Sequence, residues 1–245
     1  IYSKGEYQLL NGNQIGSLLT YYVLSSKKDK GELKDNDYIV KTIVTTSLIS
    51  DIGTDFGVKY YDTLTGFKYI GEVITRELGK ENYLVGGEES YGFLVGDLVR
   101  DKDAVNSCAF IAEMAAYFKT QGKSLYEVLL ELYVNYGFYK EKLISLTKKG
   151  KAGADEIKQM MVDLRANAPK TLGGVAVKEI RDYENQVATN LISGDTSVID
   201  LPKSDVLQFI TVDGDVISAR PSGTEPKIKF YCSVKETLLD ASNYE

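Results

Sequence analysis

The sequence contains no histidine among its 245 residues, and this absence excludes several classes of catalytic site. A Ser-His-Asp triad, a histidine metal site and a histidine general base are all ruled out. Any proton transfer by this chain must therefore use lysine, glutamate, aspartate or tyrosine side chains.

Cysteine, long apolar runs and positive charge are also scarce. No apolar run approaches the roughly 20 residues that a membrane helix needs. The two cysteines, Cys108 and Cys232, lie in apolar patterns, so we expect both to be core thiols of a protein in a reducing, cytoplasmic compartment. The net charge of −6 argues against nucleic acid or an anionic membrane as a partner.

What is present is a soluble globular composition, with 43% hydrophobic and 26% charged residues. In the first half, segments with helical periodicity alternate with short apolar segments typical of buried strands. The expected helices are 12–28, 66–78, 104–122 and 124–136, and the expected strands are 39–46, 58–64 and 82–87. This alternation predicts an α/β domain with a largely parallel sheet over residues 1–137.

The pattern changes after Gly137, where strands begin to follow one another. A strand at 139–147, a helix at 154–166 and a strand at 173–183 precede two alternating runs separated by Asp213-Gly214. An Asp-Gly pair between such runs predicts a hairpin in which both turn residues have positive φ. Residues 138–245 are therefore expected to form an α+β domain.

The loop RPSGTEP, residues 220–226, combines groups that suit a tetrahedral oxyanion. Arg220 offers a bidentate guanidinium, Ser222 and Thr224 offer hydroxyls, and the Gly223 amide has no side chain in front of it. Lys227 adds local positive charge. The same composition is also ordinary for a surface turn between strands, and the loop alone leaves both interpretations open.

Two further segments lie where strands of the first domain end. The sequence GGEESYGF, residues 86–93, offers carboxylates and hydroxyls, including Glu88 and Ser90, that suit sugar hydroxyls. Its alternative is an acidic turn followed by a capped helix. Thr65-Gly66 predicts a helix start that places Lys68 in the first turn. A lysine there with a lowered pKa is a candidate proton donor or acceptor, and a solvated surface lysine is the alternative.

Four segments in the same order resemble parts of the α-D-phosphohexomutases: residues 12–16, 65–68, 87–92 and 220–226. The resemblance is to the third and fourth domains of that family and is closest to its phosphoglucomutase branch. It implies a three-layer α/β domain over residues 1–137. A smaller α+β domain, similar to the TATA-box-binding protein, is implied over residues 138–245.

The resemblance also implies roles for the residues of these loops. Lys68 would assist proton transfer. Thr65, Gly66, Glu88 and Ser90 would bind the sugar, and the phosphate that is not transferred would contact Arg220, Ser222, Gly223, Thr224 and Lys227. The family reaction interconverts glucose 1-phosphate and glucose 6-phosphate through a phosphoserine and glucose 1,6-bisphosphate, with Mg²⁺ bound.

Two family parts have no match in this chain, namely the Ser-His phosphoserine loop and the aspartate-rich metal loop. The first residue is Ile1 rather than methionine. We therefore expect the C-terminal half of a mutase, which partners the N-terminal domains and is inactive alone. Gly92 stands where mannose- and glucosamine-handling members usually have histidine, and phosphopentoses also remain possible substrates. A phosphosugar-binding module without chemistry and a purely structural pair of domains remain as alternatives.

Overall fold

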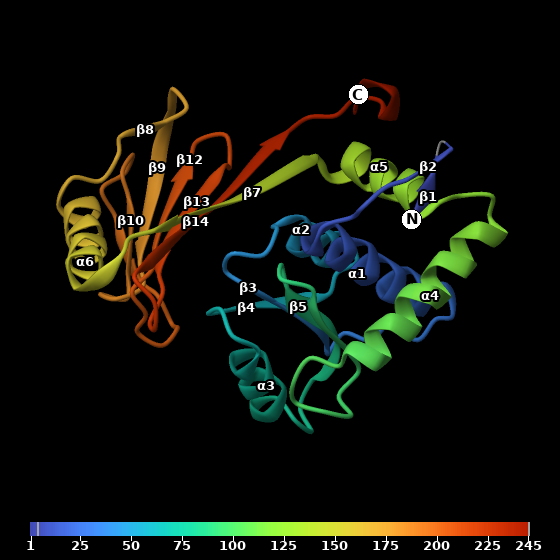
Figure 1. Ribbon diagram of the computed structural model, residues 1–245. Helices are drawn as coiled ribbons and strands as arrows, with labels where there is room; N and C mark the ends of the chain where they lie inside the picture. The colour runs from blue at the N-terminus through green and yellow to red at the C-terminus, as the bar shows by residue number, and fades with distance from the viewer. Residues whose placement is uncertain (4, 245) are drawn as a thin grey trace. The chain divides into compact units, whose positions relative to one another are not determined.

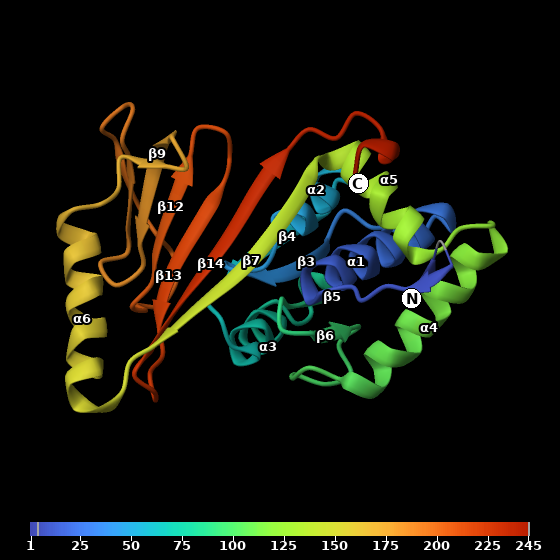
Figure 2. The ribbon, with the colours of Figure 1, turned by 45° about the horizontal axis from the view of Figure 1, so that its top comes forward.

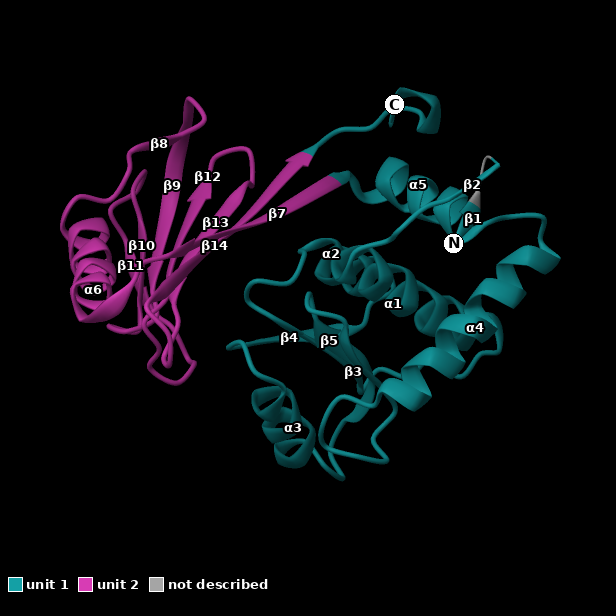
Figure 3. Ribbon diagram, viewed as in Figure 1, with its two compact units in different colours: residues 1–138, 236–245 teal, residues 139–235 magenta. Residues whose placement is uncertain are grey.

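The computed structural model describes residues 1–3 and 5–244, which form two compact units (Figure 3). Unit 1 comprises Ile1–Phe138 together with Glu236–Glu245, and unit 2 comprises Tyr139–Lys235. The predicted second domain, 138–245, differs from unit 2 because the last residues of the chain return to unit 1.

Unit 1 contains a mixed sheet with the strand order β4-β3-β5-β6. β3 runs parallel to β4 and to β5, whereas β6 pairs antiparallel with β5. The largely parallel sheet is thus confirmed. β6 was not predicted, because its four residues are too few to show a period. The strands are β3 (Asp37–Thr42), β4 (Lys59–Thr63), β5 (Asn82–Glu88) and β6 (Gly92–Val95).

Helices cover both faces of this sheet, which gives the predicted three layers. Figures 1 and 2 show α1 and α2 on one face and α3 on the other. The contacts agree: a Cβ on Gly53 of α2 would lie 2.8 Å from Ile39 Cδ1, while Val40 packs with Ile70 of α3. The helices are α1 (Gly12–Asp29), α2 (Leu48–Asp55), α3 (Phe67–Arg76), α4 (Ala104–Thr120) and α5 (Leu125–Tyr136).

The helix starts follow local capping chemistry. Asp103 accepts a hydrogen bond from Asn106 N, and Ser124 forms a capping box with Glu127, as predicted. Asn11 caps α1 in the same way. The eight-residue α2 was not predicted, because it is too short to show a helical period. No described helix has the length and apolarity to cross a membrane.

The two ends of unit 1 are short elements. Strands β1 (Tyr2–Ser3) and β2 (Glu6–Tyr7) pair antiparallel before α1. At the other end, the 3-10 helix η1 (Ala241–Tyr244) brings the Tyr244 ring against Tyr133, 5.9 Å between centroids, and Phe138, 5.4 Å. The last residues of the chain therefore contribute to the packing of α5.

Unit 2 is a sheet with one long helix, α6 (Gly150–Ala166), packed on it (Figure 2). Ile157 and Met161 of α6 pack with Leu207 and Phe209, so the core lies between the helix and one face of the sheet. The strand order is β11-β10-β9-β12-β13-β14-β7, with β8 beside β9. This α+β organisation confirms the prediction. The strands are β7 (Phe138–Thr147), β8 (Thr171–Leu172), β9 (Val175–Asp182), β10 (Val187–Asn190), β11 (Thr196–Val198), β12 (Leu207–Thr211), β13 (Val216–Pro221) and β14 (Lys227–Glu236).

The hairpin between β12 and β13 is confirmed, but its turn differs from the expected one. Only Gly214 has positive φ, at 94°, and Asp213 does not. Thr211 N donates to Asp215 O over 2.9 Å, which closes a loop longer than two residues. Such loops need a left-handed residue only near their end, so the glycine alone meets the requirement.

The prediction that both cysteines are core thiols is wrong for Cys108, which is exposed on α4, while Cys232 is half-buried. α4 is apolar on most of its sides, so its sequence does not indicate which side turns inward. Ser107, Met114 and Phe118 occupy the buried side instead.

Candidate functional site

The carboxyl ends of β4 and β5 hold two of the predicted segments close together. Gly66 N, at the start of α3, donates to Glu88 Oε1, at the end of β5, over 2.8 Å. Gly66 has φ of 120°, a conformation that a side chain would strain. The loop before α3 and the loop after β5 are therefore joined by a hydrogen bond between two of the predicted site residues, Gly66 and Glu88.

Lys68 lies in the first turn of α3, where the sequence placed it, and is exposed. Its Nζ lies 4.5 Å from the centre of the Tyr69 ring. Thr65, just before the helix, is half-buried. The ammonium is thus held near the joined loops by an aromatic face and not by a carboxylate in the described residues.

The segment 89–91 is the tight turn of the β5–β6 hairpin, so the alternative of a following helix is wrong. Glu89 O approaches Gly12 so closely that a Cβ on Gly12 would lie 1.9 Å from it. Thr45 Oγ1 donates to Glu89 Oε2 over 3.3 Å. Tyr91 has φ of 67°, and Ser90 is exposed at the tip. The hairpin therefore presents the Ser90 hydroxyl from an anchored turn.

Lys41, which was not predicted as a site residue, is 4% exposed near the end of β3. Its Nζ lies 2.7 Å from Asp62 Oδ1 and donates to the carbonyls of Thr42 and Thr45 over 3.4 Å each. A buried ammonium needs such a partner. The lysine inside the apolar run IVKTIV was a signal, but its partner lies on another strand and only the register shows it.

Lys102 lies near Glu88, and the sequence did not predict this position. A Cβ on Gly92 would lie 3.0 Å from Lys102 Cδ and 3.4 Å from Glu88 Oε2. The Lys102 ammonium lies 5.7 Å from the centre of the Phe67 ring. This lysine side chain therefore fills the space beside Gly92, at the end of the β5–β6 turn.

In unit 2, the predicted phosphate loop forms one wall of a pocket of about 540 Å³. Arg220, Ser222, Gly223 and Thr224 line it together, as expected. Lys227 is not among the lining residues, because its Nζ is paired with Glu225 Oε2 at 3.0 Å. Five lining residues come from other segments and were not predicted: Ala154, Ile157 and Lys158 of α6, together with Ser204 and Asp205.

Two cationic side chains, Arg220 and Lys158, and two carboxylates, Asp205 and Glu225, line this pocket. Both carboxylates are paired with cations outside the lining: Asp205 with Arg165 Nη2 at 2.5 Å and Glu225 with Lys227 Nζ at 3.0 Å. Within the described chain, neither Arg220 nor Lys158 has an ion-pair or hydrogen-bond partner for its side chain. Ser222 Oγ accepts from Thr224 N over 3.4 Å and thereby shapes the loop. An anion is the ligand that these free cationic groups would bind.

Among the described residues, no group of three or more carboxylates or thiols is arranged to hold a metal ion. The donors in this part of the chain therefore do not fit the Mg²⁺ that the family resemblance implies, and no catalytic step is assigned to a metal here.

Two family models match the chain in sequence. "Phosphoglucomutase/phosphomannomutase, alpha/beta/alpha domain III" matches residues 11–136, and "Phosphoglucomutase/phosphomannomutase, C-terminal domain" matches residues 151–237.

The curated relatives agree with this result, and the solved structures share the fold. A phosphoglucomutase of Staphylococcus aureus is 38% identical over 233 residues, covering 95% of this chain but 41% of the relative. The chain thus spans about two fifths of that protein's length. The open form of pp63/parafusin from Paramecium matches with a TM-score of 0.62 at 15% identity, covering 98% of this chain and 39% of that chain. A phosphoglucomutase/phosphomannomutase family protein from Burkholderia thailandensis gives 0.55 at 15% identity, with coverages of 94% and 38%.

Proposed function

The chain belongs to the phosphoglucomutase/phosphomannomutase family, and from this premise we propose that it binds the phosphosugar of a phosphohexomutase. The longer protein would interconvert glucose 1-phosphate and glucose 6-phosphate in the cytoplasm. The phosphoserine, the Mg²⁺ and the transfer step belong, in this proposal, to a part of the protein outside this chain. The N-terminal domains are therefore its partner, and glucose 1,6-bisphosphate is the intermediate.

The observation that carries the proposal is the Arg220 guanidinium in the pocket lined by residues 220–226, which has no partner among the residues that the structure describes. A phosphate accepts two parallel hydrogen bonds from this fork, and the hydroxyls of Ser222 and Thr224 line the same pocket. Gly223 leaves its backbone open to close approach. Holding the phosphate that does not react positions the sugar without taking part in bond making.

Unit 1 supplies the groups for the sugar and for a proton. Glu88 uses Oε1 on Gly66 N, which leaves Oε2 as an acceptor for a sugar hydroxyl. The exposed Ser90 hydroxyl donates or accepts a second bond, and Thr65 lies beside Gly66 in the same loop. Lys68, exposed at the helix start, moves a proton to or from a hydroxyl. Lys227 contributes only if phosphate replaces Glu225 as its partner.

The test is an NMR titration of the isotope-labelled chain with glucose 1-phosphate. Saturable shifts in residues 220–226 are expected, and Arg220→Ala should weaken binding about tenfold or more, since each charge-assisted bond contributes roughly 1.5–3 kcal/mol. Arg220→Lys should also weaken it, because lysine lacks the fork. Lys170→Ala removes an exposed charge of unit 2 outside the pocket and should leave binding unchanged.

An unchanged affinity in Arg220→Ala would overturn the assignment of the phosphate site. A parallel titration with mannose 1-phosphate and ribose 1-phosphate compares the other sugars of the family. A binding module without chemistry would give the same titrations, so mutase activity of the longer protein, lost in Lys68→Ala, is what separates the two functions.

A further inference from the structure

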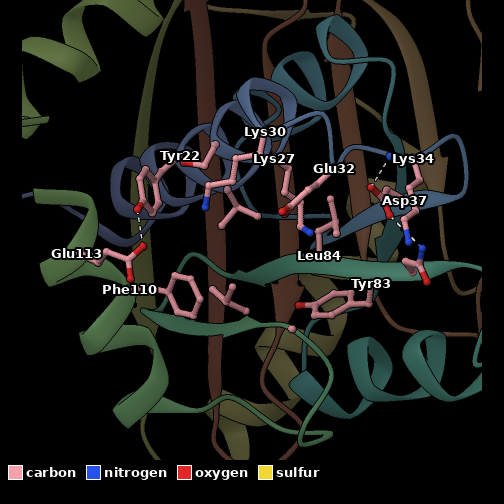
Figure 4. Close-up of a pocket in the computed structure, with 15 residues that line it drawn as sticks. Tyr22, Lys27, Lys30, Glu32, Lys34, Asp37, Tyr83, Leu84, Phe110 and Glu113 are labelled. Atoms are coloured by element: carbon pink, nitrogen blue, oxygen red, sulfur yellow. Dashed lines mark hydrogen bonds between the residues drawn. The ribbon is translucent and has the colours of Figure 1, made fainter. Parts of the chain in front are cut away.

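Unit 1 contains a pocket of about 420 Å³, and no residue of the segment 86–93 lines it (Figure 4). It is lined by the end of α1, the segment after it, the beginning of β5, the end of β6 and the middle of α4. Asn82 and Glu88 are the first and last residues of β5. The pocket therefore adjoins the amino end of β5, whereas the Glu88 contact lies at its carboxyl end.

Part of the lining of this pocket is apolar. Leu84 and Val95 come from paired strands, Val23 comes from α1, and all three are buried in the fold. Phe110 of α4 is half-buried and closes one side, opposite the residues of α1 (Figure 4). Water gains few hydrogen bonds on such a surface, so an apolar group of a ligand would displace it favourably.

Two of the carboxylates in the pocket are already bound by neighbours. Asp37, 3% exposed, accepts from Lys34 N over 2.8 Å and from Asn82 Nδ2 over 3.2 Å. Glu113 Oε1 accepts from Tyr22 OH over 2.5 Å. Burial, together with this bond, raises the pKa of Tyr22 to about 12, which keeps the hydroxyl protonated as a donor. Neither carboxylate therefore needs a lysine.

Three lysines of the lining have side chains that, in contrast to these carboxylates, lack a partner among the described residues. Lys27 lies in the last turn of α1, Lys30 is the residue that caps its carboxyl end, and Lys34 follows in the next segment (Figure 4). Their ammonium groups make no ion pair or hydrogen bond within the described chain, and Glu32 is the one further carboxylate lining the pocket. By contrast, Lys28 of the same helix lies over the Phe56 ring, outside the lining.

We propose that this pocket binds an amphipathic anion, namely a carboxylate or phosphate carried by an apolar body. The apolar body lies against Leu84, Val95 and Phe110, and the anionic group contacts the lysines. The volume is of the size that small-molecule sites have, roughly 300–1,000 Å³. The inference does not depend on the phosphosugar proposal, because the two sites share no residue.

The first experiment is an NMR titration of the whole chain with four probes: decanoate, decyl phosphate, decanol and acetate. Decanoate or decyl phosphate should give saturable shifts at Val23, Leu84 and Val95, and comparing them tells carboxylate from phosphate. Acetate lacks the apolar body and decanol lacks the charge, so each should bind at least about tenfold more weakly than decanoate. Equal binding of decanol and both anions would overturn the proposal, as would the absence of saturable shifts.

The second experiment uses variants. The double variant Lys27→Ala/Lys30→Ala should weaken decanoate binding about fivefold or more, whereas Lys28→Ala, which removes the neighbouring charge, should not. Equal loss in both variants would mean unspecific attraction and would refute the site. Saturating glucose 1-phosphate should not displace decanoate. Arg220→Ala should weaken the binding of glucose 1-phosphate and leave the binding of decanoate unchanged. These two results separate the failure of one proposal from the failure of the other.

Discussion

Gly12 and Gly223 are glycines in predicted segments, but for different physical reasons. A Cβ on Gly12 would meet Glu89 O at 1.9 Å, so the contact between α1 and the hairpin turn excludes a side chain. A Cβ on Gly223 would meet nothing within 4 Å, and its φ is not left-handed. Nothing in the fold of unit 2 therefore requires glycine at position 223, which is consistent with a requirement from a bound ligand.

Gly12→Ala is expected to destabilise unit 1 by about 1–3 kcal/mol, since the turn or the helix must shift. Gly223→Ala should leave unfolding unchanged and instead weaken glucose 1-phosphate binding. Urea unfolding followed by the amide signals of each unit measures the first effect, and the NMR titration measures the second. If Gly223→Ala lowers the stability of unit 2, a structural reason for this glycine has been overlooked.

The two thiols should differ in reactivity. Cys108 is exposed, whereas burial raises the pKa of the half-buried Cys232. At a given pH, a smaller fraction of Cys232 is thiolate than of an ordinary thiol. Its reaction rate should therefore rise only at a higher pH. Absorbance assays with a disulfide reagent between pH 7 and 10, on Cys108→Ser and Cys232→Ser separately, should show Cys108 reacting faster. Equal rates at pH 7 would contradict the burial of Cys232.

At this scale the sequence indicated loop residues but not buried partners. Gly66 precedes α3 as the predicted helix start, and Arg220 and Thr224 line one pocket, while their roles in binding stay predictions. The pairing of Lys41 with Asp62 joins two strands, and only their register places the charges 2.7 Å apart. Local pattern carries no such information.

Among the elements, the hydrogen bond from Gly66 N to Glu88 Oε1 couples the start of α3 to the end of β5. Glu88→Ala should remove about 1.5–3 kcal/mol from local stability, because the acceptor is charged. Hydrogen exchange at the Gly66 amide should then accelerate by about tenfold or more. Glu72→Ala, on the exposed side of α3, is the matched control. Unchanged exchange at Gly66 would show that the bond does not hold the loop.

Elements with a long period or a capping signal were predictable, and short ones were not. Asp103 and the Ser124 capping box fixed two helix starts within a residue of their observed places. α2, β6 and β11 have eight, four and three residues, so tertiary pairing and not periodicity determines them.

For the whole chain, the return of the last residues to unit 1 has a measurable effect. Tyr244 contacts the rings of Tyr126, Tyr133 and Phe138, and burial raises its own pKa. Tyr244→Ala should destabilise unit 1 by about 1–3 kcal/mol, because such ring pairs contribute roughly 0.5–1.5 kcal/mol each beyond burial. Unit 2 should unfold at an unchanged urea concentration, and equal destabilisation of both units would contradict the division after Phe138.

Because the chain leaves unit 1 after Phe138 and re-enters it at Glu236, unit 2 is topologically an insertion held by two covalent connections. A tension applied between the two ends of the chain is therefore borne by unit 1. Unit 2 is mechanically shielded until the segment that carries Tyr244 detaches. In an optical trap, the first increase in extension should be the small one that results when this segment detaches. The unfolding of either unit should follow.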